Sequence, residues 1–402
     1  MILSSHLSYR VLAAQEAQTL AISNKAKRLK KQGLDIVSLS VGEPDFDTPE
    51  CAKQAALHAI SQNFTHYTES DGIIELREAV ANKFINDNDI KSVSQSTILI
   101  SGGAKQCIYN VLNAICNEGD EVLIFAPYWV SYPAMVALTG ATPIIIQASF
   151  EQVYKVTPLQ LQAHLTINTK CVILNSPSNP TGIMYTEQEI RDLAAVLQDH
   201  DCFIISDEIY EKISFGDIKH FSPGAIESIA HRVITVNGVS KAYAMTGWRI
   251  GYMNAPEHVF KEASKVQGQS TSHPCSIAQK AALGALIGGD HDVENMRKAF
   301  SFRKQLVCDL LSTIPGIRFH IPDGAFYVFI ELGSILADTG IEDDALFCSY
   351  LLDRFLLALV PGSAFGNPNS IRISFAASEQ TLQKGILRLA EGISSLQNQK
   401  NV

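Results

Sequence analysis

Short apolar runs recur along the middle of the chain and predict the strands of a buried sheet. They span residues 97–100, 121–125, 142–146, 171–174, 202–206 and 232–236. Stretches with the helical spacing of apolar residues separate several of these runs, for example at 186–198. Strands that are apolar throughout and alternate with helices are typical of a mostly parallel sheet with both faces covered. The pattern therefore predicts a large α/β domain.

The two ends of the chain predict further elements. Helical spacing covers 13–31, 50–61, 73–84 and 103–116, Gly33 is expected to end the first helix, and 34–39 reads as a short strand. Beyond the large domain the pattern predicts helices at 291–311, 342–355 and 379–395 and strands at 317–320, 326–330, 357–360 and 371–375. This mixture predicts a second, smaller α+β domain.

Composition narrows the class of protein. The chain has 402 residues, of which 46% are hydrophobic and 18% charged, so two ordinary globular domains are expected. A formal net charge of −9 argues against a nucleic-acid partner. No apolar stretch is long enough for a membrane span, and the N-terminus lacks the pattern of a secretion signal. The eight cysteines form no C-x-x-C pair, so no metal site is expected. These features predict a soluble, cytoplasmic protein.

The segment at 240–252 is the most informative part of the chain for chemistry. It places Lys241 directly after Ser240 and eight residues before Arg249, among residues that are otherwise apolar or small. Burial in such surroundings lowers the pKa of a lysine, and Schiff-base chemistry requires a neutral amine. Ser240 and Arg249 are suitable phosphate ligands beside it. A lone lysine would more often lie on a surface turn, but these neighbours favour a reactive one.

An acidic residue closes one of the apolar runs. Asp207 follows 202–206, at the carboxyl end of a predicted strand, where open α/β sheets bind ligands. If Lys241 holds an aldehyde cofactor, this buried carboxylate would pair with a protonated pyridine nitrogen. Tyr210, three residues later, would donate a hydrogen bond to the ring oxygen. Alternatively, Asp207 would cap the helix that follows.

Polar turns follow two other predicted strands. Gly103, Ala104 and Lys105 lie where a strand leads into a helix, and small residues there let backbone N–H groups approach a phosphate. The glycine spacing matches neither a Walker loop nor a dinucleotide fingerprint. The turn at 175–182 contains two prolines and a glycine, which would hold Asn179 in one position. A plain connection between strand and helix remains open for both turns.

Trp129 and Arg372 complete the candidate site. Trp129 follows the run at 121–125 and suits stacking on a pyridine ring, although an isolated tryptophan is more often core filler. Arg372 lies within the apolar run at 371–375, where its charge is costly to bury unless the guanidinium meets an anion. Arg372 is therefore the candidate anchor for a substrate carboxylate.

Three motifs, at 42–49, 126–133 and 245–252, occur together and in order with the residues above. The chain resembles the class I/II pyridoxal-phosphate aminotransferases of fold type I. Within that group it is similar to the bacterial aspartate aminotransferases that lack the usual arginine for the distal carboxylate. The resemblance implies pyridoxal 5′-phosphate on Lys241, and an α-carboxylate held by Arg372 with the backbone of Gly42.

The same resemblance implies an architecture and an assembly. It implies a seven-stranded sheet in a large cofactor-binding domain at 49–290, and a small domain that combines 1–48 with 291–402. It also implies that Asn179 contacts both the ring oxygen and the substrate carboxylate. Tyr67 matches a tyrosine that reaches the phosphate of the neighbouring subunit, which implies a homodimer with shared sites.

The resemblance also implies a reaction and a substrate. Lys241 would move a proton as general base and acid in a double-displacement transfer, while Asp207 stabilises charge on the cofactor. Lys105 and Thr19 match positions that handle the distal carboxylate, so L-aspartate with 2-oxoglutarate is the expected pair. Ala17 and Glu16 depart from the usual local pattern, which leaves aromatic or broad specificity open. Some relatives also accept prephenate, and the pair of Thr19 and Lys105, with Arg10 upstream, fits that possibility.

Two other classes of protein remain as alternatives. A pyridoxal-phosphate carbon–sulfur lyase would share Lys241, Asp207, Tyr210 and Arg372, but the run at 245–248 and the N-terminal match favour the transferase. A regulator built on the same fold would require an attached DNA-binding module. The acidic composition and the N-terminal segment argue against it.

Overall fold

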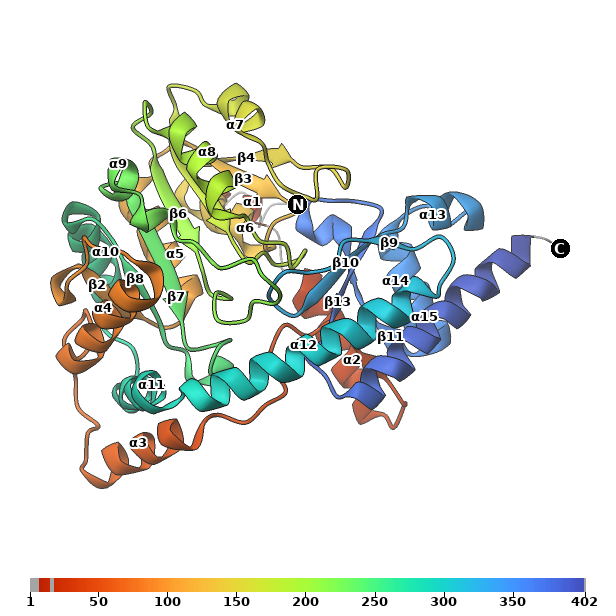
Figure 1. Cartoon of the computed structure of the whole chain (residues 1–402), viewed down its shortest axis with the longest axis horizontal. Helices are drawn as coiled ribbons and strands as arrows, with labels where there is room; N and C mark the ends of the chain where they lie inside the picture. The colour runs from red at the N-terminus through yellow and green to blue at the C-terminus, as the bar shows by residue number, and fades with distance from the viewer. Residues whose placement is uncertain (1–6, 15–17, 401–402) are drawn as a thin grey trace.

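A seven-stranded sheet forms the centre of the larger part of the molecule, in a computed structural model that describes residues 7–14 and 18–400 (Figure 1). The strands run in the order β2-β8-β7-β6-β5-β3-β4, and all neighbours are parallel except β8, which is antiparallel to β2 and β7. This confirms the predicted fold class, with one reversed strand. The strands are β2 (Ile98–Ser101), β3 (Glu121–Ala126), β4 (Thr142–Gln147), β5 (Thr169–Asn175), β6 (Phe203–Asp207), β7 (Val233–Gly238) and β8 (Gly251–Asn254).

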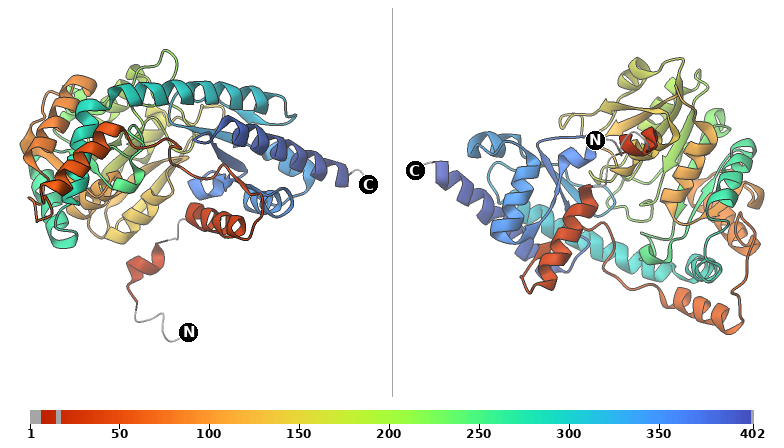
Figure 2. Two further views of the ribbon diagram at one scale, coloured as in Figure 1. Left: turned by 90° about the horizontal axis from the view of Figure 1, so that it is seen from below. Right: turned by 180° about the vertical axis from the view of Figure 1, so that it is seen from behind.

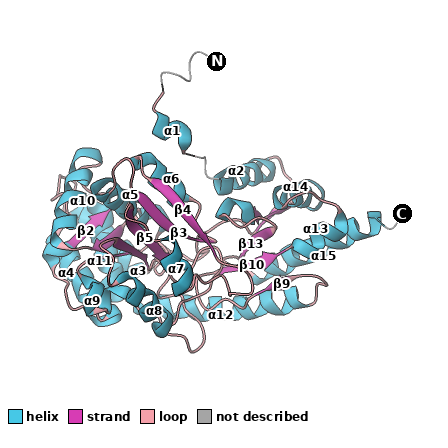
Figure 3. Cartoon of the chain, turned by 90° about the horizontal axis from the view of Figure 1, so that it is seen from above, coloured by secondary structure: helices cyan, strands magenta, loops and turns pink. Residues whose placement is uncertain are grey.

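Both faces of this sheet are buried, which explains the uninterrupted apolar runs. Successive side chains of a strand point to opposite faces. On β5, Cys171 and Ile173 accordingly join one core cluster, whereas Val172 and Leu174 join another. Helices cover both faces in Figure 3. They are α3 (Glu50–Ser61), α4 (Ile74–Asn88), α5 (Ala104–Ile115), α6 (Ser131–Thr139), α7 (Pro158–His164), α8 (Glu187–Leu197), α9 (Glu227–Ala230), α10 (Glu257–Ser270) and α11 (Ser276–Gly288).

The smaller part of the molecule combines both ends of the chain. An antiparallel sheet runs in the order β12-β13-β10-β9, and β1 pairs with β11 in parallel. The long helix α12 leads from beside α11 to this part, where it lies against α15 (Figures 1 and 2). The elements are β1 (Val37–Ser38), β9 (Arg318–Phe319), β10 (Tyr327–Glu331), β11 (Leu357–Ala358), β12 (Val360–Pro361), β13 (Ser370–Ser374), α2 (Gln18–Lys31), α12 (Asp290–Ser312), α13 (Gly333–Thr339), α14 (Asp344–Phe355) and α15 (Glu379–Lys400).

The N-terminal segment differs from its prediction. The single helix expected at 13–31 is wrong, because α1 (Tyr9–Ala13) and α2 are separate helices and the backbone at Ala14 is extended. Helix α1 packs on α6, one of the helices that cover the large sheet, whereas α2 packs on β11 and β12 of the small part. The segment thus contacts both parts, and the domain boundaries at 48/49 and 290/291 stay predictions.

Short 3₁₀ turns complete the secondary structure at η2 (Gln95–Thr97), η3 (Pro223–Ala225), η4 (Thr246–Trp248) and η5 (Gly362–Phe365). Within residues 7–14 and 18–400, no helix is long and apolar enough to cross a membrane. The parallel strands β3, β5, β6 and β7 end at the same edge of the large sheet. Loops from that edge meet β10 and β13 of the small sheet, and the candidate site lies between them.

Candidate active site

A cavity of about 390 Å³ lies where the two parts of the molecule meet, and it gathers most of the predicted site residues. Predicted residues that line it are Gly42, Ala104, Lys105, Trp129, Asn179, Asp207, Tyr210, Ser240, Lys241, Arg249 and Arg372. Residues far apart in the sequence are therefore brought to one place by the sheet edge and by β13. Cationic side chains outnumber acidic ones on its walls, since Lys27, Lys105, Lys241, Arg249 and Arg372 face only Glu43 and Asp207. Such a cavity favours ligands with several negative charges.

Asp207 is a buried carboxylate at the carboxyl end of β6. Its side chain accepts a hydrogen bond from the Tyr132 hydroxyl at 2.6 Å and one from the backbone N–H of Ile209 at 3.3 Å. Burial raises the pKa of Asp207 to about 6, against the opposing effect of these donors. Two hydrogen bonds therefore stabilise the carboxylate only in part, and a cationic ligand group would complete its environment. The alternative role, as a cap of a following helix, is wrong because the next residues form a turn.

Lys241 enters the same cavity from the loop after β7. Its Nζ donates a hydrogen bond to the carbonyl oxygen of Gly42 at 2.6 Å. Burial lowers the pKa of Lys241 to about 8, although nearby Glu43 opposes this shift. The ammonium lies 6.0 Å from the ring centres of Tyr210 and Phe326. A lysine with this pKa has a substantial neutral fraction near physiological pH, as a nucleophilic amine requires.

Arg372 forms the opposite wall and is positioned by several contacts. Its guanidinium donates to the Asn179 side-chain oxygen at 2.9 Å and to the Ser40 carbonyl at 2.7 Å. The Nε atom is buried without a hydrogen-bond partner among the described residues. Asn179 is fixed by its backbone N–H, which donates to the Asn175 side chain at 2.9 Å. The guanidinium thus keeps a fixed orientation while retaining capacity for an anion.

The N-terminus of α5 and Arg249 form a cradle of donors. Arg249 has a positive φ of 58° and donates from its guanidinium to the carbonyls of Thr246 and Gly102, each at 3.0 Å. Gly103, directly before α5, has a φ of 100°, and a Cβ there would collide with that guanidinium. The close approach therefore requires glycine. Backbone N–H groups at a helix start beside an arginine suit a phosphate.

Trp129 lies half-buried at the edge of the cavity, between two other side chains. Its ring is 5.3 Å from Tyr132 in an edge-on arrangement, and Lys105 places its ammonium 4.9 Å from the ring centre. Burial and nearby Arg249 lower the pKa of Lys105. The tryptophan is thus part of the wall and also packs against the core, so the two interpretations of its sequence position are compatible.

Gly103 and Tyr67 are predicted site residues that are not among the residues lining this cavity. Tyr67 is 91% exposed, and its ring meets His273 edge-on at 5.5 Å. Its predicted contact with a neighbouring subunit therefore stays a prediction. Thr19 belongs to α2, but its side chain lies outside the described part of the structure, as do Glu16 and Ala17.

Several wall residues had no signal in the sequence. Tyr132 and Asn175 act through neighbours, and only the folded chain brings Tyr132 to Asp207 and Asn175 to Asn179. Tyr327 reads as an ordinary aromatic residue of an apolar strand, yet it lines the cavity from β10. Lys27 reads as part of the solvated face of α2 and also lines the cavity. Spacing along the chain contains no information on such long-range neighbours.

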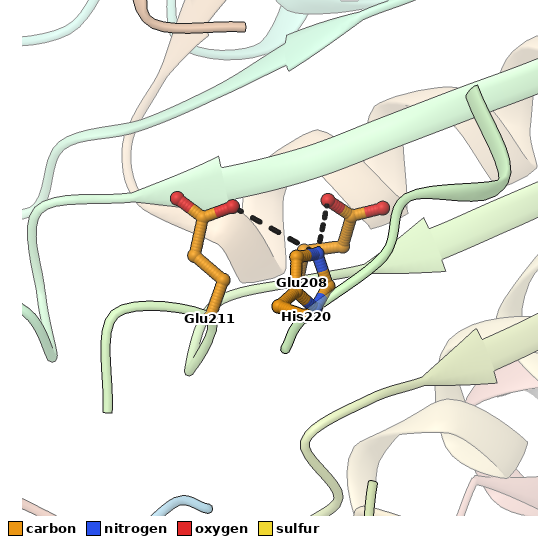
Figure 4. A group of neighbouring side chains, drawn as sticks. All are labelled: Glu208, Glu211 and His220. Carbon is orange, nitrogen blue, oxygen red and sulfur yellow. Dashed lines mark hydrogen bonds and ion pairs between the residues drawn. The ribbon is translucent and has the colours of Figure 1, made fainter. Parts of the chain in front are cut away.

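A second group of buried charges lies next to Asp207 in the sequence. Glu208, Glu211 and His220 bring possible ligand atoms within 4.8 Å of one another, and Figure 4 shows the His220 ring facing both carboxylates. His220 Nε2 lies 2.9 Å from Glu208 and 3.9 Å from Glu211. From α4, the Lys83 ammonium pairs with Glu211, and the Asn88 amide donates to both glutamates. The group is already charge-balanced, so we assign it a structural role.

Comparison with known proteins identifies the family. Residues 35–389 match the family model described as aminotransferase class I and II. An aspartate aminotransferase of Bacillus sp. (strain YM-2) is 42% identical over 95% of this chain and 98% of its own length. An aspartate/prephenate aminotransferase of Cereibacter sphaeroides is 44% identical over 95% and 97%.

Solved structures agree with these matches. An aspartate aminotransferase from Thermus thermophilus, solved with maleate, has a TM-score of 0.91 and 40% sequence identity, covering 96% of this chain and 99% of its own. One from Rhizobium meliloti has a TM-score of 0.92 and 38% identity, covering 97% and 99%. The chain therefore belongs to the class I and II aminotransferases and is itself an aminotransferase.

Proposed function

We propose that the protein transfers the amino group of L-aspartate to 2-oxoglutarate, with pyridoxal 5′-phosphate as cofactor and a double-displacement mechanism. One observation supports this most strongly: a neutralisable lysine, a buried carboxylate and a buried arginine share a single cavity. The names of the relatives add support, since several are called aspartate aminotransferases. The carbon–sulfur lyase is not favoured by any of these names.

The residues fit the cofactor in three independent respects. Asp207 has a pKa raised by burial, which a protonated ring nitrogen would lower again through charge pairing. The close approach of Gly103 to Arg249, which a Cβ would prevent, places the start of α5 beside a guanidinium, and this set of donors suits a phosphate. Lys241 has the lowered pKa that bond formation with an aldehyde needs. When bound, the cofactor supplies an aldehyde and a ring that accepts electrons released at the substrate α-carbon.

Each wall residue then has a role that follows from its contacts. Arg372 and Asn179 hold the substrate α-carboxylate, so that the α-hydrogen faces the Lys241 amine. Lys241 takes and returns that proton as general base and acid. Asp207 holds positive charge at the ring nitrogen, and Tyr132 keeps the carboxylate in position. Trp129 forms the stacking face and excludes water from it.

The surplus of cations supports a substrate with two carboxylates. Arg249 serves the phosphate, Arg372 the α-carboxylate and Lys241 the cofactor, which leaves Lys105 and Lys27 on the cavity wall. A distal carboxylate near Lys105 would gain a charge-assisted hydrogen bond, typically about 1.5–3 kcal/mol. Lys105, with Thr19 as its predicted partner, is therefore the proposed determinant of dicarboxylate specificity.

A second acceptor, prephenate, is favoured by the relative from Cereibacter sphaeroides, whose name includes it. Prephenate also carries two carboxylates, so Lys105 and Arg372 could bind it as they would bind aspartate. Amino transfer from aspartate to prephenate in the purified enzyme would establish this activity. Its absence, with 2-oxoglutarate still accepted, would restrict the enzyme to dicarboxylates of aspartate and glutamate type.

We further propose a homodimer. Exposed apolar side chains lie on two helices that pack against each other, with Leu57 and Ile60 on α3 and Ile287 on α11. Exposed apolar side chains on neighbouring helices support this proposal, because an interface with a second subunit would cover them. Tyr67 is well exposed and does not line the cavity of its own subunit, as expected of a residue that contacts a partner subunit. Sedimentation of the purified protein as a monomer would contradict this proposal.

The test of the function is a single-turnover titration of the cofactor-loaded protein. The absorbance of the lysine-bound cofactor is followed while aspartate, glutamate, tyrosine and alanine are added separately. The proposal predicts rapid loss of that absorbance with aspartate and glutamate and slow loss with the other two. Rapid conversion chiefly by tyrosine or alanine would contradict the dicarboxylate proposal but leave the transferase intact.

A further inference from the structure

Tyr327, at the start of β10, is a cavity residue to which no role has been assigned. It is only 1% exposed, and its hydroxyl lies 2.9 Å from the hydroxyl of Tyr210. Tyr210 belongs to the loop after β6 of the large sheet, whereas β10 belongs to the small sheet. This hydrogen bond therefore joins the two parts of the molecule inside the site.

The ring of Tyr327 also contacts the substrate anchor. In the register of β10 and β13, Tyr327 lies opposite Ser374, so Arg372 is its diagonal neighbour on the same face of the sheet. The guanidinium carbon of Arg372 lies 4.4 Å from the centre of the Tyr327 ring. Stacking on an aromatic face fixes the plane of a guanidinium. Tyr327 therefore helps to set the orientation in which Arg372 meets a carboxylate.

The backbone of Gly42 is the third close neighbour of this hydroxyl. A Cβ at Gly42 would lie 2.6 Å from the Tyr327 oxygen, so the third neighbour in the site is a glycine backbone. Gly42 is the residue whose carbonyl accepts from Lys241. Tyr327 is thus packed between Tyr210, Arg372 and Gly42, each of which has its own proposed role.

Counting protons gives the direction of the hydrogen bond between the two tyrosines. A phenol has one proton to donate. Tyr210 needs that proton for the ring oxygen of the cofactor, so Tyr327 must be the donor and Tyr210 the acceptor. A donor aimed at the Tyr210 oxygen polarises the phenol and strengthens its own donation.

We infer that Tyr327 is a positioning residue, whose hydroxyl directs the proton of Tyr210 toward the cofactor and whose ring aligns Arg372 for the substrate α-carboxylate. The inference rests on the proposed function, because it assumes that pyridoxal phosphate is bound at Lys241. It assigns two separable tasks to one side chain, and two substitutions separate them.

Tyr327→Phe removes only the hydroxyl. A weaker bond from Tyr210 destabilises negative charge on the ring oxygen, so the imine nitrogen bound to Lys241 holds its proton to higher pH. Its pKa, read from the absorbance of the holoenzyme against pH, is expected to rise by about 0.5–1 unit, the equivalent of one net hydrogen bond. Affinity for maleate, a dicarboxylate without an amine, is expected to stay within about twofold of the original.

Tyr327→Leu also removes the ring. Maleate affinity is then expected to fall about tenfold, in addition to the pKa change, because Arg372 loses the nearer of the two aromatic rings that help to fix its plane and keeps only Phe365. Tyr154→Phe is the matched control, since Tyr154 is buried, does not line the cavity and packs its ring edge-on against Phe329 of β10. The control is expected to change neither quantity.

A double-mutant cycle protects the test against general damage to the fold. In a Tyr210→Phe background, adding Tyr327→Phe should leave the pKa unchanged, because the phenol on which Tyr327 acts is gone. Equal changes in both backgrounds, or an unchanged pKa in Tyr327→Phe alone, would overturn the inference. If the original enzyme forms no pH-dependent absorbance with pyridoxal phosphate, the proposed function itself fails and the inference falls with it.

Discussion

Asp207 and Glu208 are adjacent carboxylates, both buried, and their surroundings are opposite in kind. Asp207 faces the cavity with two hydrogen-bond donors and a pKa raised to about 6 by burial. Glu208 faces away and accepts from the Ser206 and Ser222 hydroxyls at 2.7 Å and from Asn88 at 2.9 Å, with His220 also at 2.9 Å. Two adjacent carboxylates thus differ in their hydrogen-bond partners: Asp207 is incompletely paired, whereas Glu208 is fully paired.

The contrast separates function from stability. A buried charge that lacks partners raises the free energy of the folded state, and it persists where a ligand completes it. A buried charge with all its partners holds loops together, as Glu208 does for α4 and the 206–222 segment. An acidic side chain therefore serves catalysis at Asp207 and stabilises the fold at Glu208. Substitution of Asp207 should lower activity, and substitution of Glu208 should lower stability.

Lys241 and Lys83 provide the largest expected difference between the two sites. Lys241→Ala removes the amine that carries the cofactor and moves the proton, so transamination should fall by at least about 10²–10⁴-fold. Thermal unfolding should change little, because Lys241 pairs with a single carbonyl. A rate assay with aspartate, together with calorimetry, measures both. Retention of full activity would contradict the role assigned to Lys241.

Lys83→Met tests the structural role of the group formed by Glu208, Glu211 and His220. It leaves buried Glu211 with only the more distant His220 as a cationic neighbour, and breaking a buried ion pair typically costs about 3–5 kcal/mol of the free energy of unfolding. Urea denaturation measures this loss. The rate of the remaining folded enzyme with aspartate should stay within about twofold of the original, and a large fall in that rate would place the cluster within the catalytic machinery.

Lys105→Met tests the cationic wall of the cavity. Loss of one charge-assisted contact should raise the KM for aspartate about tenfold, while the KM for alanine, which has no distal carboxylate, should stay nearly constant. Steady-state kinetics with both substrates distinguish these outcomes. An equal effect on both amino acids would assign Lys105 to the cofactor phosphate instead.

The pH dependence of stability is the smallest expected effect. Burial lowers the pKa of His220, but Glu208 and Glu211 outweigh it and hold that pKa above the ordinary 6.5. The resulting stability is therefore fully present below about pH 6.5 and is lost as the pH rises through the raised value.

Glu211 gives the opposite limb of the pH profile. Burial raises its pKa, but Lys83 and His220 outweigh burial and hold the pKa below the ordinary 4.5, so its contribution is present above that value and lost as the pH falls. His220→Asn should flatten the alkaline limb of a plot of melting temperature against pH and weaken the acid limb only in part, because Lys83 still lowers the pKa of Glu211. An unchanged alkaline limb would contradict the assignment.

The comparison also shows what the sequence can predict. Strands of the large sheet are visible because both faces are buried, so the central positions of β5 and β7, at 171–174 and 233–236, are apolar apart from Thr235. Strand β8 was missed because its four residues begin with glycine and adjoin the lysine motif, so no apolar run stands out. Reversal of β8 depends on pairing with β2 and β7, which local pattern does not encode.

For the site, the predictable residues are those whose chemistry is unusual in their local context. Lys241, Asp207 and Arg372 are charges next to apolar runs, and all three line the cavity. Tyr132 and Tyr327 were missed because aromatic residues are ordinary in such runs. Lys83 was missed as well, since its partner Glu211 lies more than a hundred residues away in the sequence. His220 was missed because only the folding of the intervening loop brings it to Glu208 and Glu211. A polar side chain can be recognised as a site residue when its neighbours in the sequence are apolar and so show that it is buried. It cannot be recognised when only the folded chain buries it.

The most direct test of the account compares Asp207→Asn with Glu208→Gln in one preparation, by melting the cofactor-free proteins and timing the half-reaction of the loaded ones with aspartate. Asp207→Asn should stabilise the cofactor-free protein by about 2 kcal/mol at neutral pH, because an incompletely paired charge is removed. It should also slow the half-reaction by about 10²–10³-fold. Glu208→Gln should destabilise the fold by about 3 kcal/mol and leave the rate nearly unchanged. A fast Asp207→Asn enzyme, or a stable but inactive Glu208→Gln enzyme, would contradict the division of roles between these neighbours.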